Sequence, residues 1–439
     1  MNRKALIIED DAVSRHLLKT TLAKEGWEVI EAIDGQTGLD LMEEHRAAVV
    51  ICDLHIPVLN GFHVCRRIRE NPQFAKTRII VTTISRYTGD NRTALDSGAD
   101  AYLTKPVNIP ALLSLLPDSP GHEPNREFRS RMVTRSPFAS QSTMVKFWGV
   151  RGSIPVPGPT TVRYGGNTTC IEVRVGEDLF IVDAGTGIRG LGQDIMKNKR
   201  SEPLEINLFI THTHWDHIQG LPFFTPAYVT PNQVNIYGFS GAVQSLRHTV
   251  LEQMKSVYFP VNPSDLAIVS FHELKQTHFV IGDAKIRTFF TNHPGICIAY
   301  RFETPRGDIV CLADHEVNET QYRHTKGTSE DDLLYAREQD RKIEEFARGA
   351  DILIADAQFD ATEYPGRVGW GHSCIDDIVK FAHRAEVGRL VFTHHAPEHS
   401  DDKLDSMLLN ARKLAEEMGS TLTIDAAVEG AAYVLEKGE

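Results

Sequence analysis

The sequence lacks the features that mark secreted, disulfide-bonded or membrane-spanning proteins. Its six cysteines include no pair at CxxC spacing, which argues against a disulfide framework and against a zinc site built from thiolates. No stretch approaches the roughly 18 uncharged apolar residues that are needed to cross a bilayer. Acidic residues stand near the N-terminus, where a signal peptide needs its apolar region. We therefore expect a cytoplasmic globular protein with reduced, mostly buried cysteines.

The sequence also has no excess of positive charge, and its negative charge is unevenly distributed along the chain. The chain carries a formal net charge of −12. Residues 1–116 hold 14 basic against 15 acidic residues, whereas residues 144–439 hold 29 against 41. Because binding of long nucleic acid depends on neutralising its phosphates, the acidic C-terminal part is a poor platform for it. We do not expect a long nucleic acid or a membrane as a partner.

Apolar segments of strand length alternate with helical patterns over residues 1–116. The segments KALIIED, AVVICDL and TRIIVTTI are nearly continuous apolar runs, and stretches with helical spacing such as GFHVCRRIREN separate them. Strands of this kind with intervening helices predict a parallel sheet that is covered on both faces. The N-terminal domain, residues 1–116, is therefore predicted to be a doubly wound, five-stranded, flavodoxin-like α/β fold.

The character of the chain changes twice after this domain. Residues 117–143 are rich in Pro, Ser and Arg and lack sustained apolar periodicity, which predicts an interdomain linker. From residue 144 to residue 439, strand patterns with glycine-rich turns are followed by alternating strands and helices. This part predicts a single α/β or α+β sandwich of a size suited to an enzyme domain.

Polar side chains follow several of the predicted N-terminal strands. Ligand-binding residues of a parallel sheet gather at the carboxyl ends of its strands, so we expect these side chains to meet. Three carboxylates that converge there would bind a hard divalent cation such as Mg²⁺, and a lysine and a hydroxyl would contact a phosphoryl group on one of them. The residues concerned are Glu9, Asp10, Asp53, Thr83 and Lys105.

With these residues at this spacing, residues 1–116 resemble a bacterial response-regulator receiver domain. One departure is Ile84, since a small residue usually follows the switch threonine in that family. The resemblance implies a sensor histidine kinase as partner. The roles that it implies are Mg²⁺ binding by Glu9, Asp10 and Asp53, phosphoryl acceptance by Asp53, and switching by Thr83, Tyr102 and Lys105 of the Lys105–Pro106 pair.

The segment THTHWDHIQG directly follows a predicted strand and carries four metal-ligating side chains in six residues. His212 and His214 alternate along the extended chain and can point toward one ion, while Asp216 and His217 serve another. Nitrogen and oxygen ligands without a thiolate suit Zn²⁺, Mn²⁺ or iron. The pattern predicts a metal centre in the C-terminal domain.

This HxHxDH motif is similar to the signature of the metallo-β-lactamase superfamily, and the resemblance covers residues 144–435. It implies an αββα sandwich with two divalent metal ions, for which Zn²⁺ is the first expectation and Mn²⁺ or iron the alternatives. Asp183 would support the site without ligating, and Asp314 would bridge the two ions. The ligands that the resemblance implies are His212, His214, Asp216, His217, His293, Asp314 and His394, with the adjacent His395 as the alternative to His394.

Within the superfamily, two segments resemble the ribonuclease Z-like phosphodiesterases. They are GVRGSIPVPGPTTVRYGGNTTC and GHSCIDDIVKFA, and the second implies that His372 protonates the leaving group. The catalytic residues so implied are Asp216, Asp314 and His372. The domain is acidic and shows no long tRNA-binding arm, which favours a small phosphodiester such as a cyclic nucleotide. Steering of the phosphate by Arg151, Arg163 or Asn167 competes with the simpler interpretation that these are ordinary loop residues.

These observations lead to one main functional hypothesis and three alternatives. The main hypothesis is a two-component response regulator, a homodimer by default, whose output domain is a metal-dependent phosphodiesterase controlled by phosphorylation of Asp53. The alternatives are a hydrolase of another ester class, such as a lactone or thioester, a hydrolase that acts on RNA, and a catalytically weak ligand sensor. The intact set of ligand residues favours catalysis over the sensor.

Overall fold

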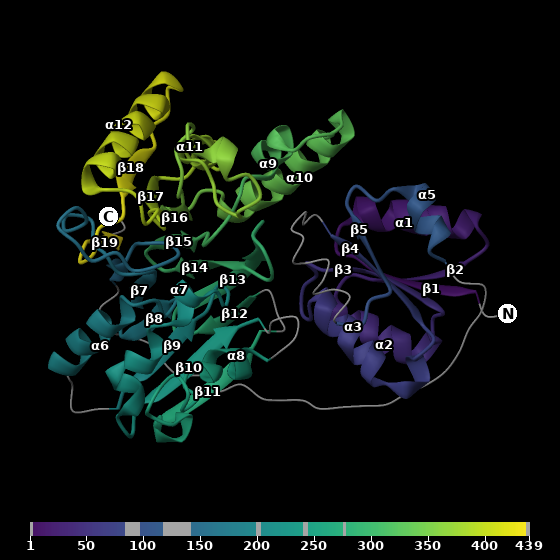
Figure 1. Cartoon of the computed structure of the whole chain (residues 1–439), viewed down its shortest axis with the longest axis horizontal. Coiled ribbons are helices and arrows are strands. Elements are labelled where there is room, and N and C mark those ends of the chain that lie inside the picture. The colour runs from purple at the N-terminus through teal and green to yellow at the C-terminus, as the bar shows by residue number, and fades with distance from the viewer. Residues whose placement is uncertain are drawn as a thin grey trace. The chain divides into compact units, whose positions relative to one another are not determined.

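The computed structural model describes residues 3–83, 97–116, 142–198, 203–239, 245–274 and 278–435. These residues form two compact units, an N-terminal one and a larger C-terminal one (Figure 1). The predicted linker, except for its last two residues, lies outside the described residues, and so does Ile84. The domain boundaries at residues 116 and 144 therefore stay predictions. In the described part of the chain, no helix is both long and apolar enough to cross a membrane.

The N-terminal unit is a five-stranded sheet flanked by helices. Its strands are β1 (Lys4–Ile8), β2 (Glu28–Ala32), β3 (Val49–Asp53), β4 (Arg78–Thr83) and β5 (Ala101–Thr104). Its helices are α1 (Ala12–Lys24), α2 (Gly35–His45), α3 (Gly61–Glu70) and α5 (Ile109–Ser114). The strand order is β2-β1-β3-β4-β5, and every neighbouring pair is parallel. The predicted doubly wound fold is confirmed.

Local sequence signals set the boundaries of these elements. The side chains of Asp11, Asp34 and Asn60 accept hydrogen bonds from free backbone N–H groups at the starts of α1, α2 and α3. Strand β3 is buried along its whole length, because helices cover both faces of a parallel sheet. The carboxyl ends of β1, β3, β4 and β5 meet at one edge, where the predicted phosphoacceptor residues lie.

The C-terminal unit contains two seven-stranded sheets. The first sheet has the order β11-β10-β9-β8-β7-β6-β19, and the second has the order β12-β13-β14-β15-β16-β17-β18. The strands of the first sheet are β6 (Thr143–Gly149), β7 (Cys170–Val175), β8 (Asp178–Val182), β9 (Glu205–Phe209), β10 (Gln233–Gly238), β11 (Ile268–Glu273) and β19 (Ala432–Leu435). Those of the second are β12 (His278–Ile281), β13 (Ala284–Phe290), β14 (Ile298–Thr304), β15 (Gly307–Cys311), β16 (Ile352–Asp356), β17 (Arg389–Thr393) and β18 (Thr423–Ala426).

Helices cover the outer face of each sheet. They are α6 (Ile188–Lys197), α7 (Trp215–Ile218), α8 (Leu246–Glu252), α9 (Asn318–His324), α10 (Glu330–Ala347), α11 (Ile375–Arg384) and α12 (Asp401–Glu417). The apolar face of α6 shares a core with the first sheet, whereas α10, α11 and α12 share a core with the second. The predicted αββα sandwich is confirmed, and Figure 1 shows α11 and α12 on the side of the second sheet away from α6.

Aromatic side chains fill the space between the two sheets. The ring centroids of Phe209 on β9 lie 5.1 Å from Tyr300 and 5.6 Å from Phe302, both on β14. Phe180 on β8 packs 5.7 Å from Phe302. Edge-to-face packing of buried rings stabilises such a layer beyond its area alone. This rigid interior fixes the strand ends of both sheets, from which the site is built.

Three of those strand ends carry an unusual backbone conformation. Asp183 after β8, Ala313 after β15 and His394 after β17 have φ angles of 64°, 57° and 59°. The left-handed region is unfavourable for residues with a Cβ atom, so the surrounding packing must hold these residues there. In each case the strained turn aims a polar side chain of that residue or its neighbour into the same interior space.

Candidate active site

The segment that follows β9 supplies the first half of a cluster of imidazoles and carboxylates. His212 and His214 lie on the extended chain before α7, and Asp216 and His217 lie within α7. His212, Asp216 and His217 are buried. Because α7 begins directly after His214, the chain turns and brings all four side chains to one side.

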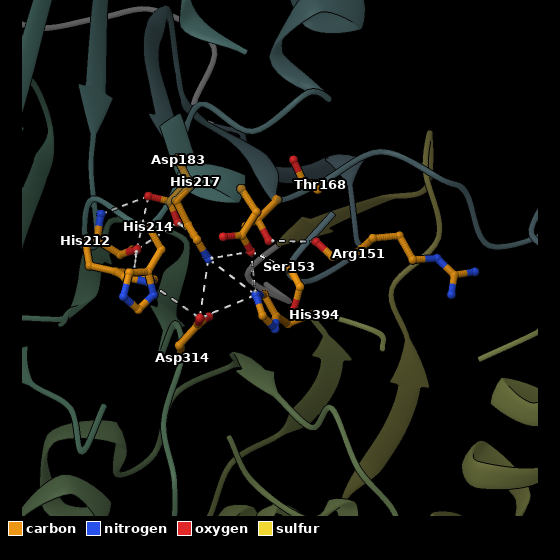
Figure 2. A network of polar contacts seen from close by, with 12 residues as sticks. Arg151, Ser153, Thr168, Asp183, His212, His214, His217, Asp314 and His394 are labelled. Atoms are coloured by element: carbon orange, nitrogen blue, oxygen red, sulfur yellow. Dashed lines mark hydrogen bonds and ion pairs between the residues drawn. The ribbon is translucent and has the colours of Figure 1, made fainter. Parts of the chain in front are cut away.

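The Asp314 carboxylate, from the turn after β15, lies at the centre of this cluster. Its Oδ2 atom is 3.6 Å from Nε2 of His212 and 3.4 Å from Nε2 of His217. The same oxygen is 3.8 Å from Nε2 of His293 and 3.4 Å from Nε2 of His394. Figure 2 shows His212, His214, His217 and His394 arranged around Asp314. One oxygen surrounded by four imidazole nitrogens is the arrangement expected of a group that bridges two cations.

Potential ligand atoms within 4.8 Å of one another group the seven predicted metal ligands around Asp314. His212, His214 and His293 form one group, Asp216, His217 and His394 form another, and Asp314 groups with His212 and His217 and also with Asp356, His372 and His394. In the first group, Nε2 of His293 lies 3.1 Å from Nδ1 of His214. In the second, the Nε2 atoms of His217 and His394 face each other at 3.3 Å. Ligation itself stays a prediction.

The protonation states of these groups fit divalent metal ions. Burial and neighbouring imidazoles lower the pKa of His212, His214 and His293, so their nitrogens are neutral and offer lone pairs. The Nε2 atom of His212 is buried without a hydrogen-bond partner among the described residues. A buried acceptor without a donor is costly unless a cation occupies the space before it. The donor set of imidazole and carboxylate without thiolate suits Zn²⁺, Mn²⁺ or iron.

The charged members of the cluster are held in the form that a metal requires, with one exception. Burial opposes ionisation of Asp216 and Asp314, but nearby imidazoles outweigh it and keep the pKa of both carboxyls below the usual value. Burial likewise opposes a charge on His217, yet Asp216, Asp314 and Asp183 outweigh it and raise its pKa well above normal. A metal ion that binds His217 must therefore displace a proton.

The receiver-like site of the N-terminal unit is smaller and contains a lysine side chain among its carboxylates. Lys105 Nζ lies 2.6 Å from Glu9 Oε2 and 2.6 Å from Asp53 Oδ2. The carboxylates of Glu9, Asp10 and Asp53 offer oxygens within 4.8 Å of one another. Burial raises the pKa of Glu9 to about 7, opposed by Lys105 and assisted by Asp53. Thr83 is buried at the end of β4.

Two residues near this site complete its geometry. Tyr102 is half-buried on β5, three residues before Lys105. His55, which sequence reasoning missed, donates its backbone N–H to Asp53 Oδ1 at 3.2 Å, and its Nδ1 atom lies 3.4 Å from Thr83 Oγ1. Its place two residues after the predicted phosphoacceptor was the available signal.

Family comparisons agree with both halves of this description. Residues 5–116 match the model of the response regulator receiver domain, and residues 179–395 match the model of the beta-lactamase superfamily domain. The chain joins a receiver domain to a metallo-β-lactamase-fold hydrolase domain. Such a receiver implies a histidine kinase or phosphotransfer partner, and the hydrolase fold implies divalent metal ions.

Individual relatives match either the receiver domain or the hydrolase domain. A ribonuclease Z of Thermoplasma acidophilum is 28% identical over 302 residues, which are 62% of this chain and 91% of that protein. The transcriptional regulatory protein AfsQ1 of Streptomyces coelicolor is 40% identical over 102 residues, 23% of this chain and only 44% of that regulator. Among solved structures, the metallo-beta-lactamase fold protein YhfI of Bacillus subtilis aligns with a TM-score of 0.47 at 18% identity, over 67% of this chain and 100% of that one.

Supporting side chains of the hydrolase domain orient the candidate ligands. Asp183 accepts hydrogen bonds from Nδ1 of His217 at 2.7 Å and from the backbone N–H of Thr211 at 2.8 Å. His293 Nδ1 donates to the carbonyl of Gly371 at 2.8 Å. Each bond fixes the tautomer of its imidazole and turns Nε2 toward the cluster. The supporting position predicted for Asp183 agrees with this geometry.

Of the two adjacent histidines after β17, the structure directs His394 to the cluster. Its Nε2 atom lies 3.2 Å from Asp216 Oδ2. His395 instead donates from Nε2 to the carbonyl of Ala427 at 2.9 Å, and burial lowers its pKa to about 3. His394 adopts φ 59°, so the chain turns at this residue, and the contacts send the two imidazoles to different partners.

His372 stands beside the cluster in a hydrogen bond that sequence reasoning did not foresee. Its Nδ1 atom donates to Asp356 Oδ2 at 2.8 Å, and Asp356 is the last residue of β16. Burial opposes a charge on His372, but Asp356 outweighs it and raises the pKa of the imidazole to about 9. The missed signal is the acid that ends the apolar strand ILIAD, a pattern that the sequence shares with LFIVD.

A second missed residue, Glu316, holds the loop that carries His372. Its buried carboxylate accepts hydrogen bonds from Tyr364 Oη at 2.7 Å, from the N–H of Gly369 at 2.8 Å and from the N–H of Gly371 at 2.9 Å. Gly371 adopts φ +87°, and a Cβ atom there would meet His293 Nδ1 at 2.4 Å. Glu316 thus fixes a turn that touches His293 and precedes His372.

The three residues considered for phosphate steering are engaged elsewhere. The Arg151 guanidinium is buried and donates to the carbonyls of Gly165 and His399, and Figure 2 shows it directed away from the cluster. Arg163 pairs with Asp402 and Asp405. Asn167 donates to Glu429, and its side-chain oxygen accepts from Thr186. The structure thus favours ordinary structural roles for all three.

Proposed function

We propose that this chain is a response regulator whose output domain hydrolyses a small phosphodiester, such as a cyclic nucleotide, under the control of phosphorylation at Asp53. The observation that carries the proposal is the His372–Asp356 pair beside a cluster of seven metal-ligating side chains. A hydrolase needs an electrophile-activating centre and a proton donor within reach of it. His372 Nδ1 lies 3.9 Å from Asp314 Oδ2, so donor and centre adjoin.

The chain's own residues would divide the reaction between them. Two divalent ions held by the seven ligands would supply Lewis acidity for the phosphoryl group and the attacking water. Water adds to phosphorus, the ester P–O bond breaks, and His372 gives a proton to the departing oxygen. His372 Nδ1 is bonded to Asp356, which leaves Nε2, without a hydrogen bond to any described residue, as the donating atom. Asp356 keeps that imidazole charged near neutral pH, since it raises the pKa of His372 to about 9 against the effect of burial.

Control by the receiver domain rests on the contacts of Lys105 and Thr83. A phosphoryl group on Asp53 would take over Lys105, now paired with that carboxylate, and would attract the hydroxyl of Thr83. We propose a sensor histidine kinase as the source of the phosphoryl group, Mg²⁺ as the cofactor at Glu9, Asp10 and Asp53, and a homodimer as the regulated assembly. Zn²⁺ is the proposed metal of the output domain.

One alternative is favoured by a specific finding. The similarity to a ribonuclease Z over 91% of that protein's length favours a phosphodiester within RNA. The balance of 29 basic against 41 acidic residues over residues 144–439 opposes a long polyanion. A small phosphodiester keeps the phosphodiester chemistry of that relative and fits the acidic balance, whereas RNA fits only the first.

Turnover by the purified, metal-loaded full chain tests the proposal. The substrates are bis-p-nitrophenyl phosphate, a panel of cyclic nucleotides and a precursor tRNA, and Asp314→Ala is the control. We expect cleavage of the small diesters that depends on metal, is lost in the control and changes after phosphorylation of Asp53. Cleavage of RNA alone would replace the small diester by RNA. No turnover with both metal ions bound would exclude a phosphodiesterase.

A further inference from the structure

A row of alternating rings and a guanidinium leads outward from His372. The ring of Phe359 lies 6.1 Å from the His372 ring at an interplanar angle of 81°. The Arg367 guanidinium lies 5.1 Å from the centroid of Phe359 and 5.5 Å from that of Trp370. Phe359 is 3% exposed, whereas Trp370 is 59% exposed. The row therefore begins in the interior at the proton donor and ends with an indole in solvent.

Arg367 differs from the other arginines near this site in having no acidic partner. Arg151 and Arg163 are bonded to backbone carbonyls and to aspartates, whereas Arg367 makes no ion pair with any residue that the structure describes. Its guanidinium carbon lies within 5.5 Å of both ring centroids, which leaves its N–H groups to bond an anion. A guanidinium joined to His372 through the ring of Phe359 is suited to an oxygen of the substrate.

A second exposed tryptophan is a chain neighbour of a candidate ligand. Trp370 directly precedes Gly371, whose carbonyl accepts from His293 Nδ1, and Trp215 directly follows His214, whose Nδ1 lies 3.1 Å from His293 Nε2. Trp215 is 72% exposed. Both exposed indoles are thus next in the chain to residues that contact His293.

Loop packing alone does not account for Trp370. Phe359 already covers one face of Arg367 and is itself buried. A tryptophan that served only to pack the loop would bury most of its area, because burial of that area is its main stabilising contribution. The uncovered face of Trp370 is instead available to another flat, apolar group.

We propose that Trp370 and Arg367 form the part of the site that selects the substrate, and that it takes a nucleotide. The base stacks on the exposed indole of Trp370, and Arg367 bonds a phosphoryl oxygen of the nucleotide. The inference rests on the proposed function for the identity of the scissile group. It adds the requirement that the diester carry an aromatic base.

Binding of a nucleotide, measured apart from turnover, tests this inference. The metal-loaded full chain is titrated calorimetrically with adenosine 5′-monophosphate and with inorganic phosphate. The proteins are wild type, Trp370→Ala, Trp370→Phe, Arg367→Lys and the control Arg341→Ala, whose arginine pairs with Glu338 on the exposed face of α10. The same proteins are assayed on a cyclic nucleotide and on trimethylene phosphate, a cyclic diester without an aromatic ring.

We expect Trp370→Ala to weaken binding of the nucleotide by about 5- to 100-fold, the range for loss of one stacked base, and to leave phosphate binding unchanged. Trp370→Phe keeps a ring and should retain most of the affinity. Arg367→Lys should weaken both the nucleotide and phosphate, because a lysine cannot stack as a planar fork. Arg341→Ala should bind like the wild type.

Three results separate this inference from the proposed function. Nucleotide that binds the wild type no more tightly than phosphate, or equal losses of both ligands in Trp370→Ala, would overturn the inference even if diesters are cleaved. Nucleotide binding that depends on Trp370 without any turnover would support the inference and reject the phosphodiesterase. A loss of kcat/KM in Trp370→Ala on the cyclic nucleotide but not on trimethylene phosphate would support both.

Discussion

The two polar sites of this chain are built alike, but the negative charge of their carboxylates is neutralised differently. Both gather side chains from the carboxyl ends of strands, in the receiver domain around Asp53 and in the hydrolase domain around Asp314. In the receiver domain, Lys105 lies within 2.6 Å of two carboxylates and neutralises them from within the chain. In the hydrolase domain, no lysine or arginine of the described residues pairs with Asp216 or Asp314; imidazoles contact both, and the backbone N–H of Ser153 donates to Asp216 Oδ2 at 2.7 Å.

This difference predicts how each site depends on metal. A carboxylate cluster with a resident lysine can stand without a cation and exchange Mg²⁺ and a phosphoryl group readily. A cluster of facing imidazole nitrogens contains no lysine or arginine and needs metal ions to bring its lone pairs together. We therefore expect tightly held ions in the hydrolase domain and exchangeable ones in the receiver domain.

The variant Asp314→Ala is the strongest test of this difference between the two sites. Loss of the oxygen shared by four imidazoles should lower turnover by about 10³-fold or more, as removal of a central catalytic group does. It should also lower the metal content, measured by inductively coupled plasma mass spectrometry. Asp53→Ala removes the corresponding centre of the receiver domain and should leave the content of tightly bound metal unchanged. Equal metal loss in both variants would contradict the distinction.

Variants at the proposed proton donor of the hydrolase domain test both the size of the loss in kcat and the direction in which the pH profile moves. His372→Ala should lower kcat by about 10²- to 10⁴-fold, the usual contribution of a general acid. A general acid must be protonated, so activity falls as pH rises through its pKa. Asp356 raises the pKa of His372 against the opposing effect of burial, and Asp356→Asn should move the descending limb of the pH profile to lower pH by about 1–3 units. An unmoved limb would remove His372 from this role.

Glu316→Gln tests whether the loop before His372 needs its buried carboxylate. An amide cannot accept from both sides as the carboxylate does, and its NH₂ group would face the N–H donors of Gly369 or Gly371. We expect metal affinity or kcat/KM to fall by about 10- to 100-fold, as for other groups that orient metal ligands. The control Glu345→Gln, on the exposed surface of α10, should match the wild type in chelator competition and in turnover.

The smallest expected effect concerns Mg²⁺ in the receiver domain. Burial raises the pKa of Glu9 to about 7, and Mg²⁺ requires the ionised carboxylate. Affinity should thus be constant above that pH and fall by about tenfold for each unit below it, as protons compete. Calorimetric titration of the zinc-loaded full chain from pH 6 to pH 8 measures this. Glu9→Gln should give a weaker affinity without that slope; a slope that persists in the variant belongs to another group.

Much of the fold and of the metal cluster could be predicted because the deciding patterns are local. Apolar runs that end in acids define the strands of the receiver sheet, and the spacing of THTHWDH places four ligand-type side chains at one strand end whatever surrounds them. His293 and Asp314 lie far along the chain from that motif, and only a resemblance to known families linked them to it.

By itself, the sequence determined the two domains, their fold classes and the residue types of both sites, since periodicity and motif spacing are properties of the chain. Tertiary structure alone decided that His394 and not His395 faces the cluster, because the chain turns at His394, where φ is 59°. It also decided the partners of His372 and Glu316 and the approach of the Arg367 guanidinium to the rings of Phe359 and Trp370. Those contacts join side chains whose relative direction depends on the packing of two sheets, and no spacing along the chain encodes it.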